Sequence, residues 1–237
     1  MTTPNVGGDD DLDSDAVALN DGSGNAMSQV VTLNSGDNDD SIDAGYFIPA
    51  KLGDYVFNDT NQNGIQDGND TGIDGVTVML LDAAGNMIAT TTTTNGGFYE
   101  FANLAPGTYK VKFPDSYTDG TDSYILTFDN NGGNDAVDSD AVPMNDGSGD
   151  AMSQLITLNS GDDNRTIDAG FIELAKVGNF IFEDVDESGT QNAGDLPLEG
   201  ATVELSGTDI FGNTVLLIET SDTVSYTHLT LPTICSV

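Results

Sequence analysis

The chain has 237 residues, of which 40 are Asp or Glu and only 5 are Lys or Arg, so its formal net charge at pH 7 is -35. Such a surface repels phosphate backbones and anionic lipid headgroups, which excludes nucleic acids and membranes as partners. It attracts cations, because a compact fold with so many carboxylates needs high salt or bound metal to offset their repulsion. Acidity that only maintains solubility in a salty habitat is the alternative, and composition does not separate the two.

Cysteine content and hydropathy limit the fold further. Cys235 is the only cysteine, so no disulfide can form within the chain. No apolar run reaches the length of a membrane span, and the first residues lack the basic and apolar regions of a signal peptide. With 37% hydrophobic residues, the chain can still fill one large or two modest β domains with real cores.

A long internal repeat organises the chain. Residues 7–45 return as residues 132–170, at an offset of 125, and 27 of the 39 aligned positions are identical. At the same offset, residues 51–80 match residues 176–205 without a gap. The repeat unit is therefore about one domain long.

Four segments follow from this alignment. We predict that residues 51–175 form one complete unit, residues 1–50 the C-terminal half of a preceding unit, and residues 176–223 the N-terminal half of a following unit. The last segment, 224–237, departs from the repeat and contains no acidic residue. We interpret this segment as a non-native tail and exclude it from the fold, with a divergent strand as the alternative.

Alternating apolar residues, separated by turns, predict strands in the complete unit. These strands contain Val76, Val78 and Leu80; Phe98 and Phe101; Tyr109, Val111 and Phe113; and the ranges 123–128, 152–158 and 166–172. Turn residues between them include the segments 84–86, 95–97 and 105–107. No stretch has helical periodicity. The predicted fold class is all-β: tandem Greek-key antiparallel β-sandwich modules of the immunoglobulin-like or prealbumin-like kind.

A twelve-residue loop, 59–70, follows the first strands of the complete unit. Calcium needs six to eight converging oxygens, which side chains at positions 1, 3, 5, 9 and 12 and the carbonyl at position 7 can supply. These predicted ligands are Asp59, Asn61, Asn63, Asp67, Asp70 and the carbonyl of Ile65. Gly64 occupies position 6, where the backbone turns sharply around the ion.

The following unit repeats this scheme. Its predicted ligands are Asp184, Asp186, Ser188, the carbonyl of Thr190, Asn192 and Asp195. Both loops are flanked by predicted strands, so neither belongs to an EF-hand helix pair, and both have Asp at position 12, where the longer Glu is common. An Asx-rich turn that needs no ion is the alternative.

A second acidic group consists of Asp135, Asp138 and Asp140. The preceding half-unit repeats it at Asp10, Asp13 and Asp15. Calcium could collect these carboxylates, and a solvated acidic loop explains them equally well.

The sequence offers nothing for catalysis. Outside the tail there is no His and no Cys, so neither a Ser-His-Asp nor a Cys-His arrangement can be assembled. No carboxylate pair stands out among the 40 acids, as a glycosidase would require. The absence of Trp removes the usual platform for sugar binding. We therefore predict that the chain is no enzyme.

Several motifs occur together in one order. They are residues 51–57 (KLGDYVF), the loop 59–70, residues 75–78 (GVTV) and residues 103–109 (NLAPGTY). In this order they resemble the B repeats of serine-aspartate-repeat surface adhesins, which are relatives of the collagen-adhesin B-type (Cna-B) sandwich. The resemblance extends to about Asp222. It implies a calcium-dependent, rigid stalk module whose ligands include the side chains named in the first loop, with Phe57 at a position where the family often has Trp.

Three functions are compatible with the composition, the repeat and this resemblance. The favoured one is a calcium-binding structural spacer of a secreted or cell-surface protein, whose partners are the neighbouring repeats. The alternatives are an adhesive module that binds an extracellular protein and an accessory domain of a secreted enzyme.

The resemblance also raises the question of an intramolecular crosslink. Cna-B relatives can crosslink a Lys to an Asn or Asp beside a buried acid. Lys51, Asp168 and Glu100 hold loosely similar places in this sequence, and we expect no such bond.

Overall fold

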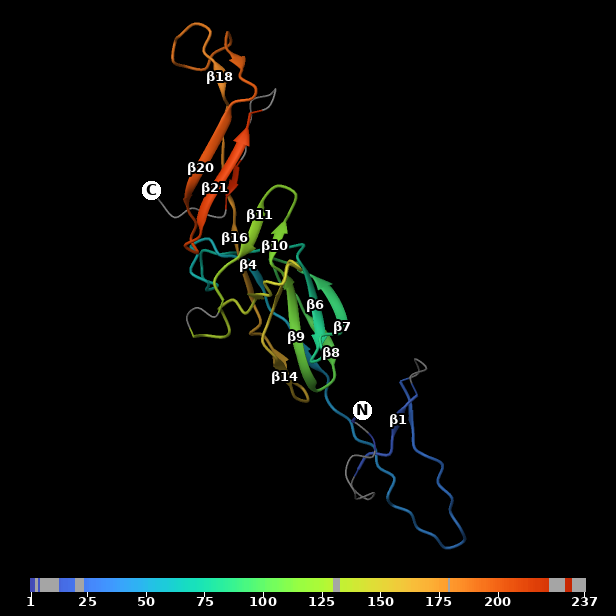
Figure 1. Cartoon of the computed structure of the whole chain (residues 1–237). Helices are drawn as coiled ribbons and strands as arrows, with labels where there is room; N and C mark the ends of the chain where they lie inside the picture. The colour runs from blue at the N-terminus through green and yellow to red at the C-terminus, as the bar shows by residue number, and fades with distance from the viewer. Residues whose placement is uncertain are drawn as a thin grey trace.

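The computed structural model describes residues 1–2, 4, 13–19, 24–129, 133–178 and 180–221, and the backbone of 229–231. These residues form strands and turns with no helix, so none of them offers a helical membrane span. Figure 1 shows the complete unit between the other two segments, with the preceding half-unit at one end of an elongated molecule and the following half-unit at the other.

The complete unit contains fourteen short strands. They are β3 (Ala50–Leu52), β4 (Val56–Asn58), β5 (Thr71–Gly72), β6 (Thr77–Asp82), β7 (Met87–Thr92), β8 (Phe101–Leu104), β9 (Gly107–Pro114), β10 (Ser116–Thr118), β11 (Ser123–Leu126), β12 (Val142–Pro143), β13 (Asp150–Met152), β14 (Ile156–Leu158), β15 (Asp163–Asn164) and β16 (Ala169–Glu173). No cis peptide bond interrupts the described backbone.

Three sheets arise from these strands. One has the order β10-β11-β16-β4-β5, the second has the order β12-β13-β9-β6-β7 with β14 also paired to β9, and the third has the order β15-β3-β8. The alternation seen in the sequence decides which side chains face inward, because successive residues of a strand point to opposite faces. Val78, Leu80, Val111 and Phe113 are buried together between the sheets, which confirms the predicted all-β sandwich.

Two pairs of strands are parallel, which the prediction of an antiparallel sandwich did not include. The β4 strand runs parallel to β16, with Val56 opposite Ala169, and β15 runs parallel to β3. Because β4 and β16 run in the same direction, the loop after Asn58 and the exit toward the following half-unit lie at the same end of the complete unit. We call this end the C-terminal pole.

Tyr99 ties the core to the last strand. Its side chain is fully buried, its ring makes edge contacts with Phe101 and Phe113 at centroid distances of 6.0 and 5.8 Å, and its hydroxyl donates a hydrogen bond of 2.6 Å to the carbonyl of Ile167. A buried hydroxyl needs such a partner, since an unpaired one costs free energy.

Phe98 lies outside β8, and β5, β10, β12 and β15 were not predicted. Two other differences from the predicted strands have a physical cause. The range 152–158 is divided into β13 and β14, because the hydroxyl of Ser153 accepts a hydrogen bond of 2.9 Å from the amide of Val111 in place of a carbonyl. The β7 strand was not predicted. It is an edge strand with mostly exposed Thr residues, so its sequence carries no apolar alternation.

The half-units reproduce parts of this plan. At an offset of 125, the pair β1 (Val17–Ala18) and β2 (Ala26–Met27) corresponds to β12 and β13. The following half-unit contains β17 (Ala175–Val177), β18 (Phe182–Glu183), β19 (Leu196–Pro197), β20 (Thr202–Thr208) and β21 (Thr214–Thr220). Inside the predicted tail, β22 (Leu229–Leu231) pairs with β17, and the rest of the tail lies outside the described residues.

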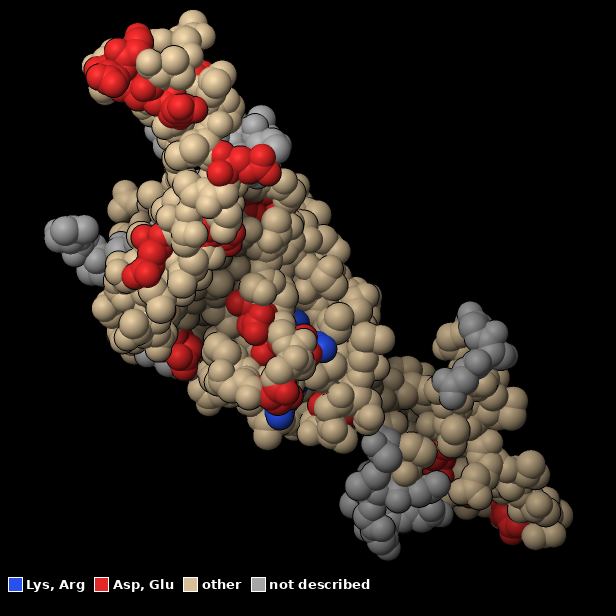
Figure 2. All heavy atoms as spheres, turned by 45° about the horizontal axis from the view of Figure 1, so that its top comes forward, with Lys and Arg blue, Asp and Glu red and all other residues tan. Residues whose placement is uncertain are grey.

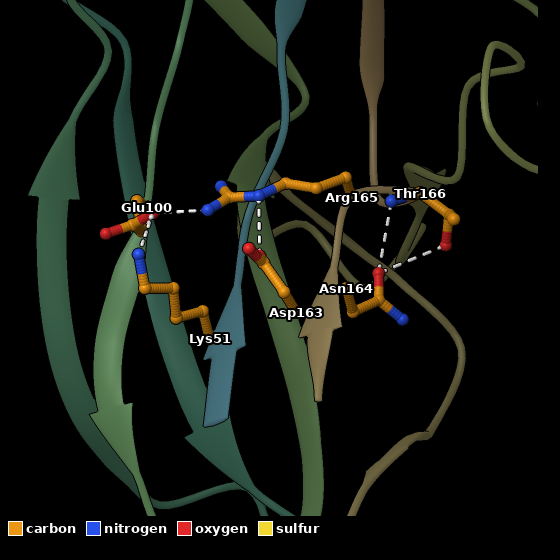
Figure 3. Close-up of polar contacts among 6 residues, drawn as sticks. All are labelled: Lys51, Glu100, Asp163, Asn164, Arg165 and Thr166. Carbon is orange, nitrogen blue, oxygen red and sulfur yellow. Dashed lines mark hydrogen bonds and ion pairs between the residues drawn. The ribbon is translucent and has the colours of Figure 1, made fainter. Parts of the chain in front are cut away.

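A group of ion pairs lies on the outer face of the β15-β3-β8 sheet (Figure 3). Arg165 forms ion pairs with Glu100 and, at 2.7 Å, with Asp163, and its guanidinium lies 5.3 Å from the centre of the Phe98 ring. The ammonium of Lys51 lies 3.6 Å from the same carboxylate of Glu100. Lys51 is therefore on the exposed face of β3, whereas Asp168 is fully buried.

We predict that replacing Gly97 by Ala destabilises the protein more than replacing its neighbour Gly96. Both glycines have positive φ, 87° and 82°, so an alanine at either costs about 1–2 kcal/mol. A Cβ on Gly97 would also collide with the carbonyl oxygen of Val56, whereas one on Gly96 would meet nothing. Overpacking of this kind adds about 1–3 kcal/mol, measurable as a difference in urea midpoint between the two variants. Equal urea midpoints of the two variants would contradict the close packing of Gly97 against Val56.

The position of Lys51 leads to a second prediction. Its ammonium pairs with Glu100 on the exposed face of β3 whereas Asp168 is fully buried, so the intact chain should have the mass of its sequence, with no intramolecular amide. Intact-protein mass spectrometry of the folded and the denatured chain checks this. A mass lower by one ammonia or one water, restored in a Lys51→Ala variant, would show that the crosslink forms.

Candidate metal centre

The loop 59–70 is organised around the side chain of Asp59. This carboxylate is buried, and it accepts hydrogen bonds from the amides of Asn63 at 3.1 Å and Gly64 at 2.7 Å. Its Oδ2 also accepts a short hydrogen bond from the hydroxyl of Thr127. Positive φ at Gln62 and Gly64, 60° and 76°, turns the backbone so that these amides face the carboxylate.

Asp67 and Asp70 close the same loop. Oδ2 of Asp67 accepts hydrogen bonds from the side-chain amides of Asn61 at 2.8 Å and Asn63 at 3.3 Å. Asp70 accepts hydrogen bonds from the backbone amides of Thr60 at 2.9 Å and Asp67 at 2.8 Å. Three of the predicted side-chain ligands, Asn61, Asn63 and Asp67, thus point toward one another through amide donors, and turning an Asn amide by half a turn would present its oxygen instead.

The loop 184–195 of the following half-unit has the same geometry. Asp184 accepts hydrogen bonds from the amides of Ser188 at 3.0 Å and Gly189 at 2.7 Å, as Asp59 does from the equivalent positions. Asp195 accepts hydrogen bonds from the amides of Val185 at 3.1 Å and Asn192 at 2.8 Å, as Asp70 does. The two loops therefore fold alike although only some of their residues are identical.

Positions 3 and 9 exchange their residue types between the two loops. The first loop has Asn61 and Asp67 there, and the second has Asp186 and Asn192, with amide-to-carboxylate hydrogen bonds of 2.8 and 3.0 Å. Each loop thus keeps three carboxylates at its predicted ligand positions. In the second loop, carboxylate oxygens of all three acids, Asp184, Asp186 and Asp195, lie within 4.8 Å of one another. The carbonyls of Ile65 and Thr190 remain predicted ligands only.

The second acidic group lies against the first loop. The amide of Gln66 donates a hydrogen bond of 2.6 Å to the carbonyl of Val137, the amide of Ser139 donates one of 3.2 Å to the carbonyl of Gly64, and Ile65 forms an isolated bridge with Asp138. Sequence reasoning treated the two groups separately, because more than sixty residues separate them and no local signal shows that they meet.

Asp135, Asp138 and Asp140 come together at this contact. Their carboxylate oxygens lie within 4.8 Å of one another, with Asp138 and Asp140 buried and Asp135 exposed. Oδ1 of Asp138 is buried and accepts no hydrogen bond from any described residue. A buried anionic oxygen without a partner is costly, so a cation fits this position.

Two further acids extend the group inward, Asp54 and Asp168. Asp168 is fully buried; its Oδ1 accepts a hydrogen bond of 3.0 Å from the amide of Tyr55, and its Oδ2 accepts none from the described residues. Its own amide donates a hydrogen bond of 2.9 Å to Asp140. From the sequence, Asp168 is only a candidate for a crosslink and Asp54 carries no signal; the exact repetition of residues 168–170 at 43–45 is a sign that Asp168 has a further role.

Burial and mutual repulsion raise the pKa values of this group. Burial raises the pKa of Asp54 to about 6 against the opposing effect of Arg165. Burial, together with neighbouring carboxylates, raises the pKa of Asp140 to about 7, that of Asp168 to about 8, and that of Asp138 in the same direction. Burial and repulsion therefore disfavour the ionised forms of these groups, a cost that a bound cation would offset.

The preceding half-unit repeats the backbone frame of this group. Asp15 and Asp43 exchange hydrogen bonds of 2.9 Å, and the amide of Gly45 donates one of 3.1 Å to the hydroxyl of Ser14. In the complete unit, Asp140 and Asp168 exchange the same pair of hydrogen bonds, and Ser139 accepts the third from Gly170. Of the earlier acidic group, Asp10 lies outside the described residues.

The donor atoms favour one class of metal. Every candidate ligand in the two loops and in the second group is an oxygen of a carboxylate, an amide, a hydroxyl or a carbonyl. Oxygen donors suit calcium and magnesium, and a flexible set of more than six suits calcium better than the strict octahedron of magnesium. Figure 2 shows many carboxylates and few cationic side chains on the visible face, with carboxylates gathered at the tip of the following half-unit.

Three comparisons place the chain among known proteins. The family profile of the SdrD B-like domain matches residues 50–171. The chain is 37% identical over 210 residues to Serine-aspartate repeat-containing protein D of Staphylococcus aureus (strain Newman), which covers 86% of this chain and 14% of that protein. It is 35% identical over 228 residues to Serine-aspartate repeat-containing protein F of Staphylococcus epidermidis, covering 95% of this chain and 12% of that protein.

Among solved structures, the shaft pilin SpaA from Lactobacillus rhamnosus GG (E269A/D295N double mutant) aligns over 79% of this chain and 83% of that one, with a TM-score of 0.33 and 13% identity. The chain spans about one seventh of the length of the curated relatives given above. The profile match covers more than half of the chain and agrees with the predicted resemblance and with a structural repeat that is no enzyme. The chain belongs to the SdrD B-like domain family.

Proposed function

We propose that the complete unit is a calcium-stabilised spacer in the stalk of a secreted or cell-surface adhesin-like protein. Its ions would bind at the loop 59–70 and at the adjoining group of Asp135, Asp138 and Asp140, and the following unit would bind calcium at the loop 184–195. The resemblance to the B repeats of surface adhesins supports the stalk and the extracellular location, and the repetition of whole units supports contacts between neighbouring repeats.

One observation carries the calcium part of this proposal. A buried, unpartnered carboxylate oxygen of Asp138 lies in a group of three carboxylates that packs against a second oxygen-rich loop. Neither region contains Lys or Arg, so the protein itself supplies no countercharge there. A divalent cation would remove the repulsion and connect residues of the loop with residues more than sixty positions away.

Calcium would act on the fold as a crosslink does. Asp59 is the first residue of the loop, directly after β4, and Asp138 and Asp140 precede β12, so ions at the two groups would hold both segments together. A chain without an internal disulfide lacks the covalent alternative. The benefit is stiffness and stability under load, which is what a spacer between domains needs.

Calcium should raise the melting temperature of the chain. Extracellular modules bind calcium with Kd of about 10⁻⁴–10⁻³ M, so two sites at ten times Kd add about 3 kcal/mol together, or about 10 °C in a unit of this size. Differential scanning calorimetry in calcium and in EDTA, at matched ionic strength, measures the gain.

Isosteric variants identify the ions' positions. Asp138→Asn and Asp70→Asn should each lose about half of the calcium-induced gain, because each removes one ligand charge from one site. Asp146→Asn is the matched control, since Asp146 is an exposed turn residue outside both groups, and it should keep the full gain. A full gain in both site variants would refute calcium binding at these positions.

In EDTA, the melting temperature should fall as the pH rises from 5 to 8. Asp54, Asp140 and Asp168 have folded pKa values of about 6, 7 and 8, above the value near 3.8 of an unfolded Asp. Between these values the unfolded chain has lost protons that the folded chain still holds, so rising pH favours unfolding.

Thermal scans at several pH values check the sign of this dependence. Saturating calcium should flatten the decline, because it binds the ionised carboxylates. Asp168→Asn should flatten it without calcium, since it removes the group with the highest pKa, whereas Asp146→Asn should leave the slope unchanged. A melting temperature that rises with pH in EDTA would contradict the burial of these groups.

A further inference from the structure

An aromatic contact joins the complete unit to the following half-unit. The rings of Phe128 and Phe211 lie 5.1 Å apart with an interplanar angle of 58°. Phe128 follows β11 at the C-terminal pole, and Phe211 lies in the turn between β20 and β21. Figure 1 shows the turn end of this hairpin against the complete unit, close to β16 and β4. Aromatic pairs of this geometry attract each other beyond simple burial of area.

The complete unit has a largely apolar hollow at this position. Ile125, Leu126, Phe128 and Pro143 line it together with Asp115, Ser116, Thr127 and Asp129, and Phe211 is the single residue of the following half-unit in the lining. Phe211 is 39% exposed, so it borders the hollow and stays partly open to solvent. The other walls of the hollow come from β10, β11 and β12 of the complete unit, so two repeats together enclose it.

The hairpin of the following half-unit is built to reach this hollow. Its turn is held by Asp209, whose carboxylate accepts hydrogen bonds from the amides of Phe211 and Asn213, just as Asp82 accepts them from Ala84 and Asn86. The turn is thus the same in both units, with Phe211 at the place of Ala84.

The strand before this turn is also longer in the following half-unit. Leu205 matches Leu80 at an offset of 125, whereas Asp209 matches Asp82 at an offset of 127, so two residues are inserted between them. The insertion and the exchange of Ala for Phe occur together, and both favour contact with the unit before.

Thr127 connects the hollow to the loop 59–70. Its hydroxyl donates to Oδ2 of Asp59, the first residue of the loop, and its amide donates a hydrogen bond of 2.9 Å to the carbonyl of Gly170 in β16. Phe128 is the next residue along the chain. The position of its ring therefore depends on how Asp59 is held. Lys176 adds a second tie, since its ammonium lies 2.6 Å from the carbonyl oxygen of Thr121 and 3.0 Å from Asp122.

We propose that the hollow at Phe128 is the docking surface for the hairpin turn of the next repeat, with Phe211 as its anchor, and that Thr127 couples this joint to the metal loop through Asp59. The first part of the proposal, docking, is supported by the aromatic contact and the hairpin insertion alone. The second part, coupling, rests on the proposed calcium function and extends the effect of calcium from the stability of one unit to the angle between two units. A second repeat of this chain is the occupant to which the proposal commits.

Tryptophan fluorescence of the full chain tests the joint, because the natural sequence contains no Trp. A Phe128→Trp variant places the single Trp in the hollow. Adding Phe211→Ala should raise its acrylamide quenching constant about twofold and shift its emission to longer wavelength, since the covering ring is lost. EDTA should raise quenching in the presence of Phe211, and Thr127→Val should remove this response, because it deletes the hydroxyl that binds Asp59.

The matched control is a Phe98→Trp variant, since Phe98 is a half-buried Phe whose ring contacts are with Tyr55 and Arg165. Its quenching should not respond to Phe211→Ala. If Phe128→Trp does not fold, the reciprocal pair, Phe211→Trp with Phe128→Ala, gives the same comparison.

Each outcome decides one half of the proposal. Quenching of Trp at position 128 that does not change with Phe211→Ala would overturn the docking surface. A response to Phe211→Ala without a response to EDTA would overturn the coupling and leave the docking intact. Absence of any calcium effect on the melting temperature, with a normal response to Phe211→Ala, would refute the proposed calcium function while the joint stands.

Discussion

The uncompensated charge inside the complete unit is the constraint on which the rest of the structure depends. Asp135, Asp138 and Asp140 come together beside the loop 59–70, and Asp54 and Asp168, which precede β4 and β16, extend this charge into the unit, where Arg165 lowers the pKa of Asp54. Backbone amides satisfy part of this charge, as at Asp168 and Asp140. Two buried carboxylate oxygens, Oδ1 of Asp138 and Oδ2 of Asp168, accept no hydrogen bond from the described residues, and a cation would compensate their charge.

The loops are folded before any ion is considered. Asp59 and Asp184 draw amides of positions 5 and 6 around themselves, and Asp70 and Asp195 hold positions 2 and 9. Binding would therefore spend little free energy on ordering the backbone and would mainly exchange amide donors for the ion. The exchange of Asn and Asp between positions 3 and 9 keeps three carboxylates at the predicted ligand positions of each loop, and the charge of the ligands is one of the quantities that set calcium affinity.

Sequence reasoning succeeded where the signal was local. The alternation of Val76, Val78 and Leu80 decides which face is buried, and the spacing of oxygen donors in 59–70 predicts a loop that the structure closes around Asp59. It failed where distant segments meet. Nothing local in 135–140 says that Ser139 and Asp138 pair with the loop, and nothing in Asp54 or Asp168 distinguishes a buried acid from the chain's many exposed ones.

The direction of the strands explains why the loop 59–70 and the contact with the following half-unit lie at the same pole. Because β4 and β16 are parallel, the strand that leads into the loop and the strand that leaves the unit end together. The loop consequently lies at the same end as the following half-unit, and Thr127, which bonds Asp59 of the loop, stands next in the chain to Phe128, which contacts Phe211. An antiparallel arrangement of the same two strands would have put the loop at the opposite end, where an ion could stabilise the unit and still leave the junction free to bend.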